Sequence, residues 1–114
     1  MAKTRMAIGL LALCVLSACH KAPEDERASA LKSAADQQAR QIEDQAKTQT
    51  QGMEQQADSL KAQAKQAGGY TGERLKVQAD ALEREADIIE KQANTRADGI
   101  RESAEAQAKL ISSR

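Results

Sequence analysis

Gly68-Gly69-Tyr70-Thr71-Gly72 contains three of the six glycines in this 114-residue chain and divides two long stretches of helix-forming residues. Glycine is a poor helix former and often ends helices, and Lys65 in the turn before it suits a helix C-terminus. Thr71 can cap a following helix, with Glu73 in its first turn. We therefore expect a glycine-rich turn over 68–72 between two helices.

Apolar residues recur on both sides of this turn at steps of three and four, which is the spacing of one face of an α-helix. Pro23 and the three acids after it mark a helix start. The expected helices cover 24–67 and 73–111, with a frayed tail over 112–114. One series is spaced by eleven residues without a break: Leu31, Ile42, Met53, Ala64, Leu75, Ala86, Ala97 and Ala108. An eleven-residue repeat gives nearly straight or slightly right-handed helix packing.

This all-α pattern is compatible with two architectures. One is a long antiparallel two-helix hairpin that packs like a coiled coil, and the other is a single rod of about 135 Å at 1.5 Å per residue. Folding at the turn sets residue i opposite roughly 139 − i, so that large side chains meet alanines. Examples are Leu31 with Ala108, Ile42 with Ala97 and Met53 with Ala86. The complementarity favours the hairpin.

The composition argues against a thick core and against nucleic-acid binding. Tyr70 is the only aromatic residue, and the apolar content is mostly alanine, which buries little surface. The 17 basic residues balance the 17 acidic ones, and loss of residues 1–18 would remove two basic residues, Lys3 and Arg5. Such a chain has no electrostatic attraction to polyanions. We expect no nucleic-acid partner.

The first nineteen residues have the plan of a secretory signal: Lys3 and Arg5, an apolar run over 6–16, and Leu16-Ser17-Ala18-Cys19. The run is too short to span a bilayer, which takes about 20 residues. The stretch Leu16-Ser17-Ala18-Cys19 resembles the lipobox of bacterial lipoproteins. We expect a signal peptide over 1–18, cleavage between Ala18 and Cys19, and a tether over 19–23. An uncleaved signal anchor stays open as the alternative.

The resemblance to bacterial lipoproteins implies an anchor and a location. In that class the cysteine, here Cys19, carries a diacylglycerol and an N-acyl chain, and two acyl signals hold a protein stably on a membrane. An Asp after the cysteine favours the inner membrane, whereas His20 stands there in this chain. The resemblance thus implies the periplasmic face of the outer membrane, with the inner membrane second.

The plan of lipobox and Ala-rich helical body is also similar to that of the murein-linked lipoproteins of enteric bacteria. Those end in a lysine joined to peptidoglycan, whereas this chain ends in Ser112-Ser113-Arg114. The difference argues against covalent wall attachment. An envelope protein or a second copy of the chain remains as a partner.

No catalytic or metal-binding set emerges from the residue pattern. The single histidine, His20, has no Cys, Asp or second His spaced as a co-ligand, and no nucleophile has a base to pair with. We expect no cofactor, no metal and no enzymatic activity. Tyr70 is either packed over the helix ends or a contact for a partner at the tip, with packing favoured.

Three functions fit these features. The first is a lipid-anchored structural, spacer or partner-binding lipoprotein of the bacterial envelope. The second is a desiccation or stress protectant, because the Ala/Lys/Glu/Gln-rich eleven-residue repeats resemble those of late-embryogenesis-abundant proteins. The third is an adaptor for an envelope complex.

Overall fold

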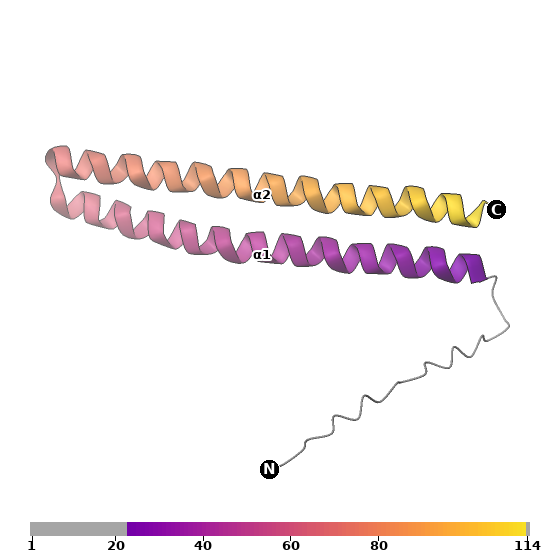
Figure 1. Cartoon of the computed structure of the whole chain (residues 1–114). Coiled ribbons are helices and arrows are strands. Elements are labelled where there is room, and N and C mark those ends of the chain that lie inside the picture. Colours follow the sequence, from indigo (N-terminus) through magenta and orange to yellow (C-terminus); the bar gives the residue numbers. More distant parts are fainter. Residues whose placement is uncertain (1–22, 114) are drawn as a thin grey trace, which may run out of the picture.

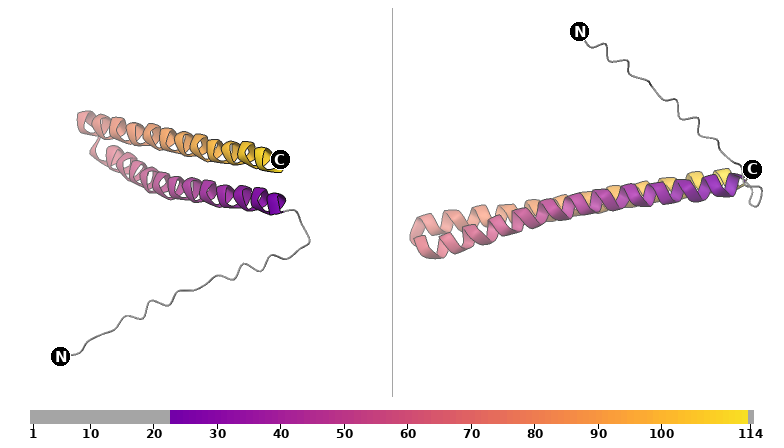
Figure 2. Two further views of the ribbon diagram at one scale, coloured as in Figure 1. Left: turned by 45° about the vertical axis from the view of Figure 1, so that its right-hand side comes forward. Right: turned by 90° about the horizontal axis from the view of Figure 1, so that it is seen from below.

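A computed structural model describes residues 23–113, which form two long helices. α1 (Pro23–Ala67) and α2 (Gly69–Ser112) lie side by side and antiparallel along their whole length (Figure 1). Two further views show the same pairing (Figure 2). The extended shape, 68 × 15 × 8 Å, is that of a helical hairpin. The all-α hairpin is therefore confirmed, and the single rod is excluded.

The connection between the helices is shorter than the sequence predicts. α1 ends at Ala67 and α2 begins at Gly69, so that Gly68 alone lies outside a helix. Gly68 has φ 62° and ψ 177°, and Gly69 has φ 57°. Such positive φ values are easily reached only by glycine. The Gly68 N–H donates to the Ala64 carbonyl oxygen at 3.0 Å, and the Gly72 N–H donates to the Gly68 carbonyl oxygen at 3.0 Å.

The expected turn over 68–72 and the expected cap at Thr71 are therefore wrong. Two consecutive positive-φ glycines reverse the chain at once, so Tyr70, Thr71 and Gly72 belong to the first turn of α2. Gly68 occupies the N-cap position, and no side chain caps the helix. The outer ends of the helices agree with the expected bounds to within one residue.

The contact between the helices is built from small side chains. Each helix buries only small residues, and apart from Thr50 and Gly72 all of them are alanines. The buried residues are Ala28, Ala35, Ala39, Ala46, Thr50, Ala57 and Ala64 on α1, and Gly72, Ala79, Ala86, Ala93, Ala97, Ala104 and Ala108 on α2. Many recur at intervals of eleven, as in Ala35, Ala46 and Ala57 or Ala86, Ala97 and Ala108, so the seam shares the eleven-residue spacing of the sequence. The Thr50 hydroxyl is satisfied by the Lys47 carbonyl oxygen at 3.1 Å.

The large aliphatic side chains lie beside the seam and not within it. We call this set the apolar edge, and each member is partly exposed: Leu31, Ile42, Met53, Leu60, Leu75, Leu82, Ile89, Ile100 and Ile111. The expectation that large side chains interleave with alanines between the helices is therefore wrong. Because alanines from both helices fill the contact, the helices approach closely and displace larger side chains sideways. The expected offset of the helices holds approximately, since Arg101 contacts residues on both sides of the position predicted opposite it.

Candidate functional site

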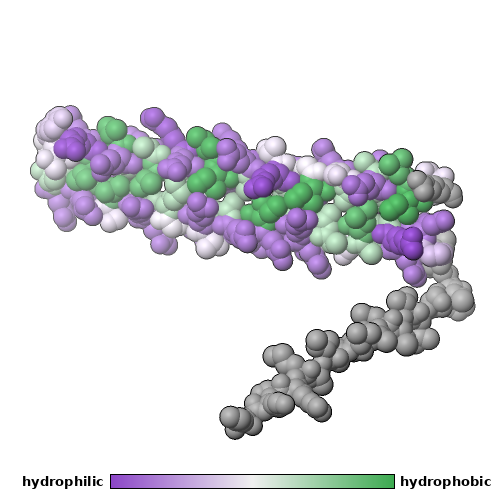
Figure 3. All heavy atoms as spheres, viewed as in Figure 1, coloured by the Kyte–Doolittle hydropathy of each residue, from purple (hydrophilic) through white to green (hydrophobic). Residues whose placement is uncertain are grey.

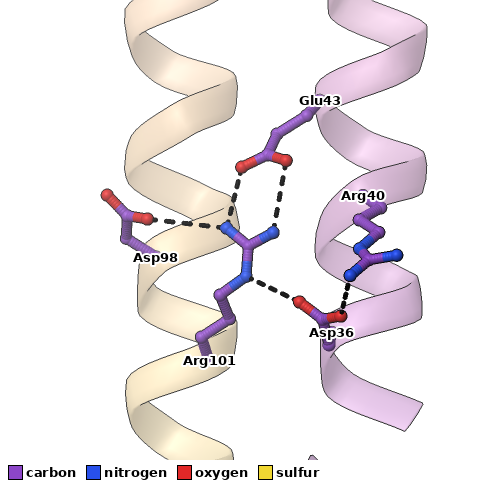
Figure 4. A network of polar contacts seen from close by, with 5 residues as sticks. All are labelled: Asp36, Arg40, Glu43, Asp98 and Arg101. Atoms are coloured by element: carbon purple, nitrogen blue, oxygen red, sulfur yellow. Dashed lines mark hydrogen bonds and ion pairs between the residues drawn. The ribbon is translucent and has the colours of Figure 1, made fainter. Parts of the chain in front are cut away.

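Arg101 of α2 joins the two helices through two carboxylates of α1 (Figure 4). Its Nη1 and Nη2 donate to Glu43 Oε1 and Oε2 at 2.8 and 3.2 Å, and its Nε donates to Asp36 Oδ1 at 3.1 Å. Arg40 Nη2 also pairs with Asp36 Oδ2 at 2.9 Å, and Asp98 Oδ1 lies 3.7 Å from Arg101 Nη1. We call these five residues the Arg101 cluster. Paired, bidentate geometry is the strongest form of such an ion pair.

The cluster shifts the pKa values of Glu43 and Arg101 in opposite directions. The hydrogen bond from Arg101 lowers the pKa of Glu43, and partial desolvation opposes this only in part. Hydrogen bonds to Glu43 and Asp36 raise the pKa of Arg101 above its usual range. Glu43 and Arg101 therefore stay charged at neutral pH, and their ion pair joins the two helices.

A second ion pair, between Lys61 Nζ and Glu83 Oε1, joins the helices nearer the turn. Its hydrogen bond to Glu83 raises the pKa of Lys61. Both side chains are partly exposed. Together with the Arg101 cluster, this pair fixes which residues of α1 face which residues of α2.

The ion pairs and the apolar edge lie on opposite faces of the hairpin. Four ion-pairing residues directly follow a member of the apolar edge, in the pairs Ile42–Glu43, Leu60–Lys61, Leu82–Glu83 and Ile100–Arg101. Adjacent helical residues differ by about 100° in direction, always in the same sense. In an antiparallel pair this puts the ionic side chains of both helices on one face, which we call the charged face. The aliphatic side chains fall on the other.

Apolar side chains gather in a stripe between more hydrophilic borders along the hairpin (Figure 3). On the apolar side, a shallow open groove of about 390 Å³ lies between the helices. Its walls include Leu31 and Gln38 of α1 and Arg96, Ile100 and Gln107 of α2. The groove is too open to enclose a small ligand, and it presents a long surface instead.

The tip of the hairpin presents Tyr70, whose surface is 77% exposed. The expectation that Tyr70 packs over the helix ends is therefore wrong, and its role as a partner contact stays a prediction. Val77, one more exposed apolar residue, lies two turns further along α2 and lines a shallow depression with Tyr70. On the charged face, Lys61, Lys65 and Lys76 lie near this end beside Glu73 and Asp80. The mixture of signs leaves no strongly cationic or anionic patch there.

The remaining predicted site residues, Ala18, Cys19 and His20, lie outside the described residues. Within residues 23–113, no group of three or more His, Cys, Asp or Glu side chains is placed to hold a metal ion. None of the helices in that range has the length and apolar character needed to cross a membrane.

Sequence reasoning missed the Arg101 cluster, although a signal for it was present. The predicted offset sets Arg101 opposite Gln38, so that Asp36 and Glu43 lie within reach of its long side chain. Comparison with known proteins adds no relative from which a role could be transferred: the chain matches no protein-family model, no curated protein and no solved structure.

Proposed function

We propose that this chain is a lipid-anchored lipoprotein of the bacterial envelope that acts as a spacer or partner-binding rod and catalyses no reaction. The observation that carries the proposal is Leu16-Ser17-Ala18-Cys19, whose cysteine stands four residues before the start of α1 at Pro23. A short tether of this kind would keep the helices close to the membrane. The outer membrane is the proposed location, since His20 replaces the Asp that favours inner-membrane retention.

The hairpin geometry suits a spacer. The start of α1 and the end of α2 lie at one end, and the Gly68 turn lies at the other (Figure 1). A chain anchored through Cys19 would therefore present its turn up to 68 Å from the anchored end. Tyr70 is exposed at that far end, where a partner in the periplasm could reach it.

The alanine seam supports a second candidate function, that of a desiccation protectant. No large side chain among the described residues is fully buried. Burial of apolar surface stabilises a fold by roughly 25 cal/mol per Å², and an alanine side chain has little surface to bury. The hairpin alone is therefore weakly stabilised. A protectant would be disordered in dilute buffer and become helical on drying. A spacer would give a helical circular dichroism spectrum in dilute buffer.

Mass spectrometry of the chain expressed in a Gram-negative host tests the anchor. We expect a mature N-terminus at Cys19 carrying a diacylglycerol and an amide-linked acyl chain. Cys19→Ala should abolish acylation and cleavage and leave the longer precursor, whereas the matched variant Cys14→Ala should mature normally. A mature chain that begins elsewhere, or acylation that survives Cys19→Ala, would overturn the proposal.

A further inference from the structure

One side of α1 carries no charge over most of its length. We call it the uncharged flank, and its residues follow one another at steps of three, four or seven along the helix. They are Ala34, Gln38, Gln41, Gln45, Gln49, Gly52, Gln56, Gln63 and Ala67, and all are exposed. The acidic and basic residues of this part of α1 all lie elsewhere on the helix. Such segregation is not needed by a helix that faces water on every side.

The uncharged flank continues the apolar edge. Ala34, Gln45 and Gln56 follow Leu31, Ile42 and Met53 by three residues, which turns them about 60° from the edge and away from the charged face. Gln38 lines the same groove as Leu31 and Ile100, which places the flank and the edge on one side of the hairpin. This side therefore has partly exposed aliphatic side chains at its centre and amides along one border.

We propose that a second copy of this chain docks on this side, so that two hairpins form a four-helix bundle with both turns at the same end. The parallel arrangement rests on the proposed function, because two copies anchored in one membrane must extend in one direction. A hairpin face measures 68 by 15 Å, roughly 1,000 Å² in outline, which is large enough to accommodate the ~800 Å² that each partner buries in a standard stable interface.

The charges on the α2 border fit a second copy. Arg96 lines the groove, and Glu85 and Arg74 precede it by eleven and twenty-two residues, so all three point to this side. A two-fold axis along the hairpins lays α1 of each copy over α2 of the other. The charged side chains of α2 then meet the uncharged flank, whose amides can donate to Glu85 and accept from the arginines. No like charges oppose one another in this arrangement.

The amides also argue against a lipid surface as the occupant. Glutamine side chains transferred to hydrocarbon would lose hydrogen bonds to water without replacing them. Against a second copy they find polar partners, while the aliphatic edges of the two copies cover each other. The two hairpins would thereby bury the large side chains that one hairpin leaves partly exposed.

Disulfide cross-linking of the full chain in cells tests the interface, because the proposed acylation of Cys19 leaves an introduced cysteine as the free thiol. Met53→Cys lies near the two-fold axis, and its neighbour Glu54→Cys lies at the same level toward the charged face. With an oxidant, we expect most of the Met53→Cys chain to migrate as a dimer on a non-reducing gel, and less than one tenth of the Glu54→Cys chain. Equal yields, or no dimer from Met53→Cys, would overturn the proposal.

Mass spectrometry of the same chain separates this proposal from the proposed anchor. If Cys19 is not acylated, the proposed function fails independently of the docking face. If Cys19 is acylated and Met53→Cys does not cross-link, the docking face alone fails.

Charge placed on the flank gives a second readout. In the Met53→Cys background, Gln56→Glu adds an acid to the uncharged flank at the level of Glu85 in the other copy, so that the two carboxylates repel. Gln55→Glu adds the same charge on the outer side of α1. Glu and Gln have similar helix propensity, and circular dichroism confirms folding. We expect the flank variant to lower the dimer yield at least fivefold and the outer variant to leave it unchanged. Equal effects would contradict the interface.

Discussion

At the residue scale, Arg101 specifies the alignment of the helices more than it strengthens their contact. Partly exposed ion pairs contribute little to stability because water screens them. Arg101, however, contacts carboxylates seven residues apart on α1, and a shift of α2 by one helical turn would break one or both contacts. An alanine seam by itself discriminates poorly between such alignments, since one alanine resembles the next. The cluster supplies the missing specificity.

The Arg101 cluster makes the hairpin sensitive to acid through Glu43. In the folded state the hydrogen bond from Arg101 lowers the pKa of Glu43. In an unfolded chain the pKa of a glutamate is about 4.3. The ion pair of Glu43 with Arg101 therefore stabilises the hairpin fully above about pH 4.3. This stabilisation is lost as the pH falls through the pKa that Glu43 has in the folded state. Glu43→Gln should show a smaller fall in melting temperature between pH 7 and pH 3 than the parent, and Glu54→Gln an unchanged one. Thermal melts followed by circular dichroism measure this, and equal falls for all three chains would contradict it.

The seam alanines allow no larger side chain. Ala97 is 0% exposed and faces α1, so Ala97→Leu must push the helices apart. Overpacking costs about 1–3 kcal/mol, which lowers the melting temperature by roughly 5–15 °C in a domain of this size. Ala106→Leu makes the same change on an exposed position of α2 and should shift it by less than about 3 °C. If Ala97→Leu melts at or above the parent temperature, the seam is not as close as the structure has it.

At the scale of the elements, glycines in the helices have opposite roles. A Cβ at Gly72 would lie 2.6 Å from the Ala64 carbonyl oxygen, so the backbone would have to move. A Cβ at Gly52 meets nothing within 4 Å. We expect Gly72→Ala to destabilise the hairpin and Gly52→Ala to stabilise it by about 0.4–1 kcal/mol through helix propensity. Urea denaturation of both variants checks the signs, and stabilisation by Gly72→Ala would show that the helices do not meet so closely beside the turn.

The two helices, the hairpin and its approximate offset could be predicted because each follows from local periodicity and from glycines. The composition of the contact could not. A stripe containing both Leu31 and Ala35 is equally compatible with a seam of leucines and a seam of alanines, since both lie within one helical face. The choice depends on how closely two helices approach, which is a property of the pair. The exposure of Tyr70 could not be predicted either, because it follows from the tight reversal of the chain at Gly68 and Gly69.

At the scale of the whole molecule, the proposed location depends on the residue after the anchor. Under the proposed function, His20→Asp supplies the residue that favours inner-membrane retention in bacterial lipoproteins. We expect the acylated chain to move from the outer-membrane to the inner-membrane fraction of a Gram-negative host on a sucrose gradient. His20→Ser is the matched control and should remain in the outer membrane. Retention of the parent chain in the inner membrane would contradict the proposed sorting.

The repeat also sets the length of the hairpin, and it does so in units of eleven. Eleven residues make almost three whole turns, so removal of 47–57 from α1 and of 82–92 from α2 leaves every remaining side chain on its original face. The shortened hairpin should keep a cooperative thermal transition, and its long dimension should fall by about 16 Å at 1.5 Å per residue.

A matched deletion of five residues from each helix, 47–51 and 88–92, separates the role of phase from that of length. Five residues rotate everything beyond the cut by about 140°, which turns the alanines on one side of the cut away from the partner helix. Although this chain is longer than the first, it should lose the cooperative transition. Circular dichroism melts and small-angle scattering of both chains decide the matter. Comparable folding of the two would mean that the eleven-residue spacing of the seam does not hold the helices together.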